Sequence, residues 1–470
     1  MSLAGRFRWF LAPSFLQAGI SFVSIPIATL WLGPADYGSF ALVMSFSSLG
    51  CAISCLGSSF VFAKIHSSNQ KVELMARVVT QQILIAHSIA IALAVTLIIF
   101  WPYLVQILPS LRTIPKFGVN LAAVSMLPTT MWSLAADLLT LDGRAKLFAI
   151  TVMAQSVFSA GALIGSLLWF NTDVSALFIA NSIGAFILGI GAAVAFVRYL
   201  TWPDFWGAKT GVLSGATTIT FANIFEMIYP PIERNLLVAN VGVAALGLHT
   251  HAQQYRTVVA VAIKALARAI WPITLEESQE RFLTFNRTRA HWNTAYFVVG
   301  TAGIIFATHG SDLIGLITHE KFANAGPYAA AGIAYLLVQN MGKPFTGILY
   351  ATGQATAFAK YSMGAGFVAL IVAATAIPLI GVWGAILAGF THQLFLRMAM
   401  KILVSRKVNA PFTDQWAIAE LLLILFVLFL VWAVDLSFAA RGALLFLILL
   451  INTFVFLWVE RRVVVQNNSK

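Results

Sequence analysis

Apolar residues run along the chain in long continuous stretches, separated by short polar or Gly/Pro breaks. Each stretch has about 20 residues, the length with which an α-helix crosses the hydrocarbon core of a bilayer, whereas the strands of a membrane barrel alternate in polarity. We place fourteen helices at residues 10–32, 38–62, 78–101, 117–138, 147–169, 174–198, 213–239, 243–268, 292–310, 326–350, 358–379, 381–402, 416–434 and 440–459. The pattern predicts an all-α polytopic membrane protein.

Composition supports this class. The chain is 60% hydrophobic and only 10% charged, where a soluble domain carries about 25% charged residues. No polar segment is long enough for a soluble domain. The largest is residues 271–291, whose amphipathic charge pattern indicates a cytoplasmic connecting helix at the membrane surface.

Positive charge is distributed unequally between the two ends of the predicted helices. If the N-terminus is cytoplasmic, 23 of the 29 Lys and Arg residues lie at or near cytoplasmic ends; the other six are Arg112, Lys116, Arg234, Arg256, Lys321 and Arg441. Such a bias predicts that both termini are cytoplasmic, in a bacterial inner membrane. It also accounts for most of the net charge of +12, which argues against nucleic acid as a partner.

Two pairs of short strings recur at a nearly constant offset. Residues 32–38 (LGPADYG) follow the first helix and residues 241–247 (VGVAALG) the seventh, both with glycines five apart. Residues 143–149 (GRAKLFA) and 353–359 (GQATAFA) open the fifth and eleventh helices. The offsets are 242 − 33 = 209 and 353 − 143 = 210. Coincidence of short strings is the alternative, but the shared spacing favours an internal duplication.

The repeated strings lie six helices apart, so the two copies run in parallel. Parallel repeats related by an axis along the membrane normal are typical of transporters, with the substrate cavity between the halves near the midplane. We therefore predict two six-helix lobes around a central cavity, at residues 1–205 and 206–405, and two further helices with a cytoplasmic tail in residues 406–470.

Three motifs resemble a known family. They are the string Leu32-Gly33-Pro34-Ala35-Asp36-Tyr37-Gly38-Ser39-Phe40, the pattern Gly143-Arg144-Ala145-Lys146 before helix five, and Glu233-Arg234-Asn235-Leu236-Leu237 in helix seven. Over residues 1–405 the sequence is similar to the polysaccharide flippases (O-antigen or exopolysaccharide, Wzx type) of the multidrug/oligosaccharidyl-lipid/polysaccharide exporter superfamily.

The resemblance implies a transporter, not an enzyme. Its substrate would be an undecaprenyl-diphosphate-linked oligosaccharide, moved from the cytoplasmic to the periplasmic leaflet by alternating access. Membrane lipids, a polysaccharide polymerase and assembly proteins are the implied partners, with no cofactor beyond a coupling H⁺ or Na⁺. The related lipid II flippases carry arginines within helix one, whereas here Arg6 and Arg8 lie only at its mouth, so cell-wall precursor transport is disfavoured.

Buried ionisable residues concentrate in the seventh and eighth helices, and each costs at least about 2.5 kcal/mol in hydrocarbon without a partner, a cavity or a function. Glu226 is predicted near the midplane, and Glu233 lies seven residues later on the same face. Pro230 and Pro231 between them should kink or break the helix. We interpret these four residues as a coupling and gating element; a purely structural kink is the alternative.

Cations dominate the eighth helix. His249 and Arg256 are seven residues apart on one face, and Lys264 and Arg268 continue the stripe. With Arg234 they suit a lipid-linked diphosphate, because guanidinium groups bind phosphate oxygens in bidentate fashion. An ion pair between Arg256 and Glu226, and snorkelling of Lys264 and Arg268 to the interface, are the competing explanations. Weaker candidates for substrate binding are Arg77 and Lys343.

Two other functions compete with polysaccharide-lipid transport. A multidrug exporter of the same superfamily would prefer an acidic cavity for cationic drugs, whereas the buried excess here is basic. A membrane glycosyltransferase or polymerase would place a carboxylate or histidine in a large periplasmic loop. The longest such loops predicted here are residues 102–116 and 311–325.

Overall fold

The computed structural model describes residues 22–55, 72–107, 114–142, 144–170, 174–200, 228–279, 286–341, 355–405, 415–434 and 436–468, with isolated positions at 16, 17, 19, 20, 58, 62, 111 and 112. Only the backbone is described at 72–75, 170, 262, 264–279, 286–290, 355–359, 405, 415–416 and 458–468. Within these ranges the chain is helical apart from turns and contains no strand, which confirms the all-α class.

The helices match the predicted apolar stretches closely. They are α2 (Pro34–Cys55), α4 (Val72–Ile107), α5 (Lys116–Leu141), α6 (Ala145–Phe170), α7 (Ser175–Phe196), α9 (Val243–Gln279), α10 (Asn286–Thr318), the short 3₁₀ helix η2 (Ala323–Ala325), α11 (Gly326–Met341), α13 (Ala355–Ile380), α14 (Val382–Ser405), α15 (Gln415–Val434) and α16 (Phe438–Asn468). Nine helices among the described residues are long and apolar enough to cross a membrane, and α9 and α14 are not among them.

Three predicted connections are wrong, because helices continue past the apolar core into the polar interface. The predicted 102–116 loop is shortened, since α4 runs to Ile107. α9 extends through Gln279 and α10 begins at Asn286, so the described part of the 271–291 connector consists of the ends of α9 and α10. With 37 residues, α9 is ~56 Å long at 1.5 Å per residue. α10 likewise runs to Thr318, which shortens the predicted 311–325 loop and places His309 inside a helix.

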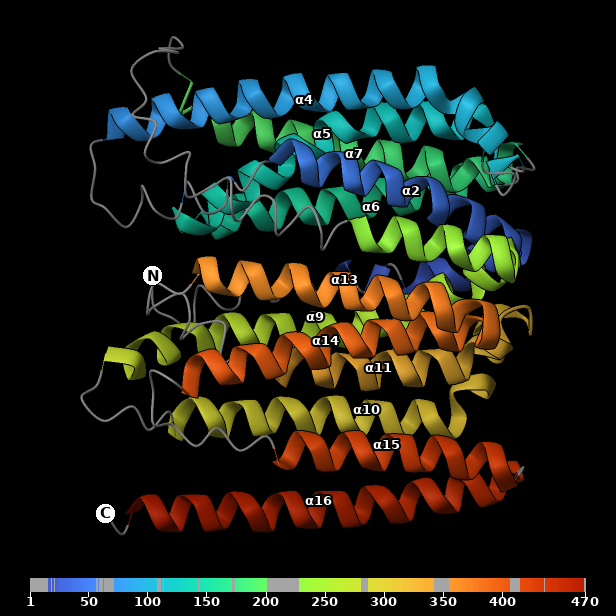
Figure 1. Ribbon diagram of the computed structural model, residues 1–470, viewed down its shortest axis with the longest axis vertical. Helices are drawn as coiled ribbons and strands as arrows, with labels where there is room; N and C mark the ends of the chain where they lie inside the picture. The colour runs from blue at the N-terminus through green and yellow to red at the C-terminus, as the bar shows by residue number, and fades with distance from the viewer. Residues whose placement is uncertain are drawn as a thin grey trace. The chain divides into compact units, whose positions relative to one another are not determined.

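The first of two compact units comprises residues 1–247 and 355–385. Its central helix is α5, which contacts α2, α4, α6 and α7, as their neighbouring ribbons in Figure 1 show. Large side chains fill the core between them, including Phe62, Leu134, Leu138 and Phe196.

The second unit comprises residues 248–354 and 386–470. Here α10 is central and contacts η2, α11, α15 and α16 (Figure 1). Its core contains Trp292, Tyr296, Ile333, Leu337 and Ile424. α15 and α16 therefore pack on the body of this unit.

The two repeated glycine strings meet in the first unit. A Cβ atom added at Gly38 would collide with the Val243 carbonyl group and lie only 2.9 Å from the carbonyl carbon. A Cβ atom added at Gly247 would collide with the Pro34 carbonyl group and lie 2.5 Å from the carbonyl carbon. At the offset of 209, Pro34 corresponds to Val243 and Gly38 to Gly247 (34 + 209 = 243; 38 + 209 = 247). Each string thus contacts the other through equivalent positions, which is the reciprocity of a two-fold contact.

Gly242 has a separate role beside this crossing. Its φ of 109° is accessible to glycine but not to residues with a side chain. Its amide donates to the Leu237 and Val238 carbonyls, which closes the end of the helix formed by residues 228–240. The chain then turns directly into α9.

Polar contacts also join the ends of α4, α5 and α7. The Tyr199 hydroxyl, just after α7, donates to the Asp142 carboxylate at the end of α5. Thr80 Oγ1 of α4 donates to the Tyr199 carbonyl at 2.9 Å. Burial and the bond to Asp142 raise the pKa of Tyr199, so the phenol keeps the proton that it donates.

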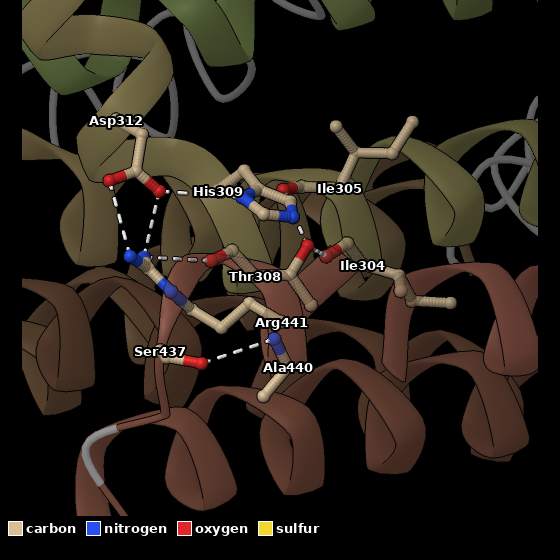
Figure 2. A network of polar contacts seen from close by, with 8 residues as sticks. All are labelled: Ile304, Ile305, Thr308, His309, Asp312, Ser437, Ala440 and Arg441. Carbon is tan, nitrogen blue, oxygen red and sulfur yellow. Dashed lines mark hydrogen bonds and ion pairs between the residues drawn. The ribbon is translucent and has the colours of Figure 1, made fainter. Parts of the chain in front are cut away.

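An ion pair attaches the start of α16 to α10. Figure 2 shows the Arg441 guanidinium directed at Asp312, with Nη1 2.8 Å from Oδ2 and Nη2 3.3 Å from Oδ1. Arg441 Nη1 also donates to the Thr308 carbonyl, and His309 lies 3.3 Å from Asp312. Bidentate geometry makes this pair stronger than an isolated surface ion pair.

Arg441→Ala is therefore expected to lower the free energy of unfolding by about 1 kcal/mol, since the pair is only partly shielded from solvent. In a double-mutant cycle with Asp312→Asn, thermal unfolding in detergent should yield a coupling energy of about 1 kcal/mol. Arg112→Ala, at an exposed arginine of the other unit, is the control and should change stability by less than about 0.5 kcal/mol. Equal effects of Arg441→Ala and Arg112→Ala would show that the ion pair does not anchor α16.

Candidate functional site

One face of α9 carries three polar residues at helical spacing. His249, Gln253 and Arg256 follow one another at intervals of four and three residues, so they lie on adjacent turns of the same face. Gln253 Nε2 donates to His249 Nε2 at 2.7 Å. This face contributes to the lower hydropathy of α9, and it places Arg256 in a continuous polar stripe.

Arg256 reaches from α9 to α11. Its guanidinium carbon lies over the Tyr335 ring, 5.0 Å from the ring centroid, a distance at which the ring face attracts a cation. The side chain passes Gly332, one turn before Tyr335: a Cβ there would lie 3.6 Å from Arg256 Cδ. The absence of a side chain at Gly332 leaves the guanidinium group room beside the ring.

Tyr335 is held in turn by α14. Gln393 Nε2 donates to the Tyr335 hydroxyl at 3.2 Å and lies 3.1 Å from His392 Nδ1. One turn earlier, Phe390 meets the Tyr335 ring edge-on at a centroid distance of 5.9 Å. Three helices of the second unit thus converge on one group of residues, Arg256, Tyr335 and Gln393, which we call the arginine–tyrosine site.

The arginine–tyrosine site carries a net positive charge. Among the described side chains, no carboxylate lies within ion-pair distance of Arg256, and in this unit Asp312 pairs with Arg441 while Glu420 accepts from Asn452. A partly buried guanidinium without a counter-ion attracts anions strongly, because solvent screens it incompletely. The aromatic ring and the amide add a stacking surface and a hydrogen-bonding group beside the guanidinium.

The structure brings together only some of the predicted substrate-binding residues. Arg256 and His249 share the α9 face, whereas Arg77 is exposed near the start of α4. The backbone at Lys264 and Arg268 continues the helix of α9, but their side chains, and the whole of Lys343, lie outside the described residues. The roles of these residues stay predictions.

The coupling element is described in part. Glu226 lies outside the described residues, while residues 228–240 form a helix with Pro230 and Pro231 in its first described turn, a position that tolerates proline. Glu233 is buried, and Arg234 Nη1 donates to the Ala41 carbonyl of α2 at 2.7 Å. Arg234 therefore joins this helix to α2. The predicted kink or break at Pro230 and Pro231 stays a prediction, because Glu226 on the other side of the prolines lies outside the described residues.

Tyr335 and Gln393 are site residues that the sequence did not identify. Neither is charged, so the search for ionisable residues in apolar helices passed over both. A usable signal was present in α14, where His392 and Gln393 interrupt an apolar run beside Gly389. The sequence alone does not show which faces of α11 and α14 turn toward α9, because that depends on how the helices pack.

Comparison with known proteins places the chain in a family. The sequence profile described as "Polysaccharide biosynthesis protein" matches residues 7–276, more than half of the chain. The chain belongs to this family. No curated protein sequence matches it.

Solved structures of the multidrug/oligosaccharidyl-lipid/polysaccharide superfamily share the fold. The lipid II flippase MurJ, in an inward closed conformation, aligns with a TM-score of 0.64 at 14% identity, covering 95% of this chain and 98% of MurJ. An inward-facing multidrug resistance MATE transporter aligns with a TM-score of 0.62 at 12% identity, covering 84% and 94%. A mutant MATE transporter from Vibrio cholerae gives 0.59 at 13% identity, covering 86% and 98%. At such identities the likeness shows the fold alone, which is that of transporters and flippases.

Proposed function

We propose that this protein flips undecaprenyl-diphosphate-linked oligosaccharide repeat units from the cytoplasmic to the periplasmic leaflet for polysaccharide synthesis. Its family and its transporter fold support the general class. The observation that carries the substrate class is Arg256 above Tyr335, a cation with no described carboxylate partner. A diphosphate would supply the missing negative charge, and the sugar next to it would pack on the ring.

The direction of movement follows from the proposed topology. Both termini are cytoplasmic in the inner membrane, as the positive-inside distribution of 23 against 6 basic residues supports. Alternating access exposes the substrate to one leaflet and then the other. Glu226 is the proposed site for a coupling H⁺ or Na⁺, with Glu233 and the two prolines forming the gate. Membrane lipids surround the protein, and a polymerase would receive its product.

Transport by purified protein in liposomes tests this function. A fluorescent lipid-diphosphate oligosaccharide should move between leaflets, whereas the same lipid without phosphate should move far more slowly, because it offers nothing for Arg256 to bind. Transport should also respond to an imposed H⁺ or Na⁺ gradient in the wild type and lose that response in Glu226→Gln. Equal rates for the charged and neutral lipids would contradict the proposed substrate class.

A multidrug exporter is the alternative function, which the MATE-like fold favours. Such a protein would carry cationic drugs, and these would be repelled by a positively charged arginine–tyrosine site. Uptake of a cationic dye by the same liposomes, without movement of the lipid diphosphate, would establish the drug exporter instead.

A further inference from the structure

An acidic side chain is buried in α15, far along the chain from the proposed coupling element. Glu420 is the only ionisable residue of this helix, whose sequence is QWAIAELLLILFVLFLVWAV, and only 2% of it is exposed. An ionisable residue within an apolar helix is costly, so its presence requires a partner or a function. Glu420 has no part in the arginine–tyrosine site.

α10 leaves a space that the Glu420 carboxyl group fills. A Cβ atom at Gly300 would collide with Oε2 of Glu420 and lie 2.9 Å from its Cγ. One turn further on, a Cβ at Gly303 would lie 2.9 Å from Ile424 Cγ1. The two glycines let α15 approach α10 closely, and the carboxyl group occupies the position that a side chain at residue 300 would need.

α16 supplies one hydrogen bond to the carboxyl group. Asn452 Nδ2 donates to Glu420 Oε2 at 3.2 Å, and Asn452 is itself buried, with 7% exposed. The other oxygen, Oε1, is buried and has no hydrogen-bond partner in the described part of the protein. The site therefore has one satisfied oxygen and one buried oxygen that still lacks a ligand.

No described charged group neutralises Glu420. On α10, the residue that faces Glu420 is Gly300, and the nearest ionisable residue of this helix is Tyr296, one turn away. The Tyr296 hydroxyl donates to the Asn340 carbonyl and interacts electrostatically with Arg397 of α14. The described ionisable residues of α11 are Tyr328 and Tyr335. The described ionisable residue of α16 is Arg441, which lies eleven residues before Asn452 and is paired with Asp312. A carboxylate here would thus be an uncompensated charge in a low-dielectric interior, which is strongly unfavourable.

The number of oxygen atoms around Oε1 of Glu420 determines whether a metal cation or a proton can bind there. A hard metal cation such as Mg²⁺ takes about six oxygen ligands, whereas the described groups at Glu420 add at most the amide oxygen of Asn452. A proton requires one oxygen only. We propose that Glu420 is a proton-binding site, with the proton on Oε1 and with Oε2 accepting the hydrogen bond from Asn452. Release of that proton to water leaves a negative charge between α10, α15 and α16 and weakens their packing.

Infrared spectroscopy of the purified protein tests the site without any transport substrate. At neutral pH in D₂O, the wild type should show the C=O stretching band of a protonated carboxyl group, which Glu420→Gln should remove. Glu320→Gln is the matched control: Glu320 is exposed, outside the buried contact between α10, α15 and α16, so its replacement should leave the band intact. A wild-type spectrum without the band, or a difference spectrum between the wild type and Glu420→Gln without it, overturns the proposal. A band that stays in both proteins belongs to another carboxyl group, such as Glu226.

Three further measurements separate the proton from other ligands and from effects on folding. Adding Na⁺ at constant pH should leave the band unchanged; its loss on adding Na⁺ would mean that the site binds a metal cation instead. Asn452→Leu should keep the band but shift it to higher frequency, because Oε2 loses its hydrogen bond. The thermal midpoint of the wild type should fall as the pH is raised above the ordinary titration range of a glutamate, because the folded state keeps a proton that the unfolded state has lost. The fall should be steeper than that of Glu420→Gln, and parallel curves would contradict the proposal.

Discussion

Arg256→Ala is expected to slow movement of the lipid diphosphate at least tenfold in the liposome assay. A hydrogen bond to a charged group contributes about 1.5–3 kcal/mol, and about 1.4 kcal/mol corresponds to a factor of ten in rate. Arg256 is partly shielded from solvent above Tyr335 and has no described carboxylate partner. Its interaction with an anionic substrate should therefore be in the upper part of that range.

Further variants at the arginine–tyrosine site distinguish charge from geometry. Arg256→Lys keeps the charge but loses the planar, bidentate donor and the stacking on the ring, so its rate should fall between those of the wild type and Arg256→Ala. Arg112→Ala removes an exposed arginine from the other unit and should transport normally. If Arg256→Ala is folded, as judged by its thermal midpoint, and transports at the wild-type rate, the diphosphate does not bind at Arg256.

Gly247→Ala should destabilise the protein more than a methyl group added at a glycine that faces only flexible side chains. The new Cβ would collide with the Pro34 carbonyl, a backbone group that cannot rotate away. Overpacking of this kind costs about 1–3 kcal/mol, and because backbone opposes backbone we expect the upper end of that range. Gly38→Ala should behave in the same way through its contact with Val243.

The two substitutions should also be non-additive. Once Gly38→Ala has separated the two helices, Gly247→Ala meets less resistance, so thermal unfolding of the double variant should show less destabilisation than the sum of the single effects. Gly161→Ala in α6 is the matched control, because no described atom lies within 4 Å of the added Cβ. Strict additivity, or equal effects of Gly161→Ala and Gly247→Ala, would show that the helix crossing is not tightly packed.

The helices were predictable because hydrocarbon imposes a minimum apolar length. The stretches 117–138 and 416–434 correspond to Lys116–Leu141 and Gln415–Val434. Helix ends were less predictable, since outside the hydrocarbon a helix can continue with polar residues. For that reason the predictions ended α9 at residue 268 and α10 at residue 310, whereas α9 continues to Gln279 and α10 to Thr318.

Residues on one helix were easier to associate than residues on different helices. Helical periodicity alone placed His249 and Arg256 on one face, but it could not show that Tyr335 and Gln393 complete the site, because that depends on which faces pack together. Glu420 was missed for another reason. The rule that identified Glu226 applies equally to a glutamate inside AIAELLLILF, but α15 was regarded as an appendage and not searched.

The reciprocal contact between Gly38 and Val243 and between Gly247 and Pro34 bears on the origin of the protein. A contact that pairs equivalent positions needs no covalent link between its two helices, and two identical chains could form it equally well. Its geometry is what a homodimer of six-helix subunits would leave behind after gene fusion. In a single chain each glycine faces a partner that is encoded separately, so a bulkier residue at either position requires a compensating change in the other repeated string.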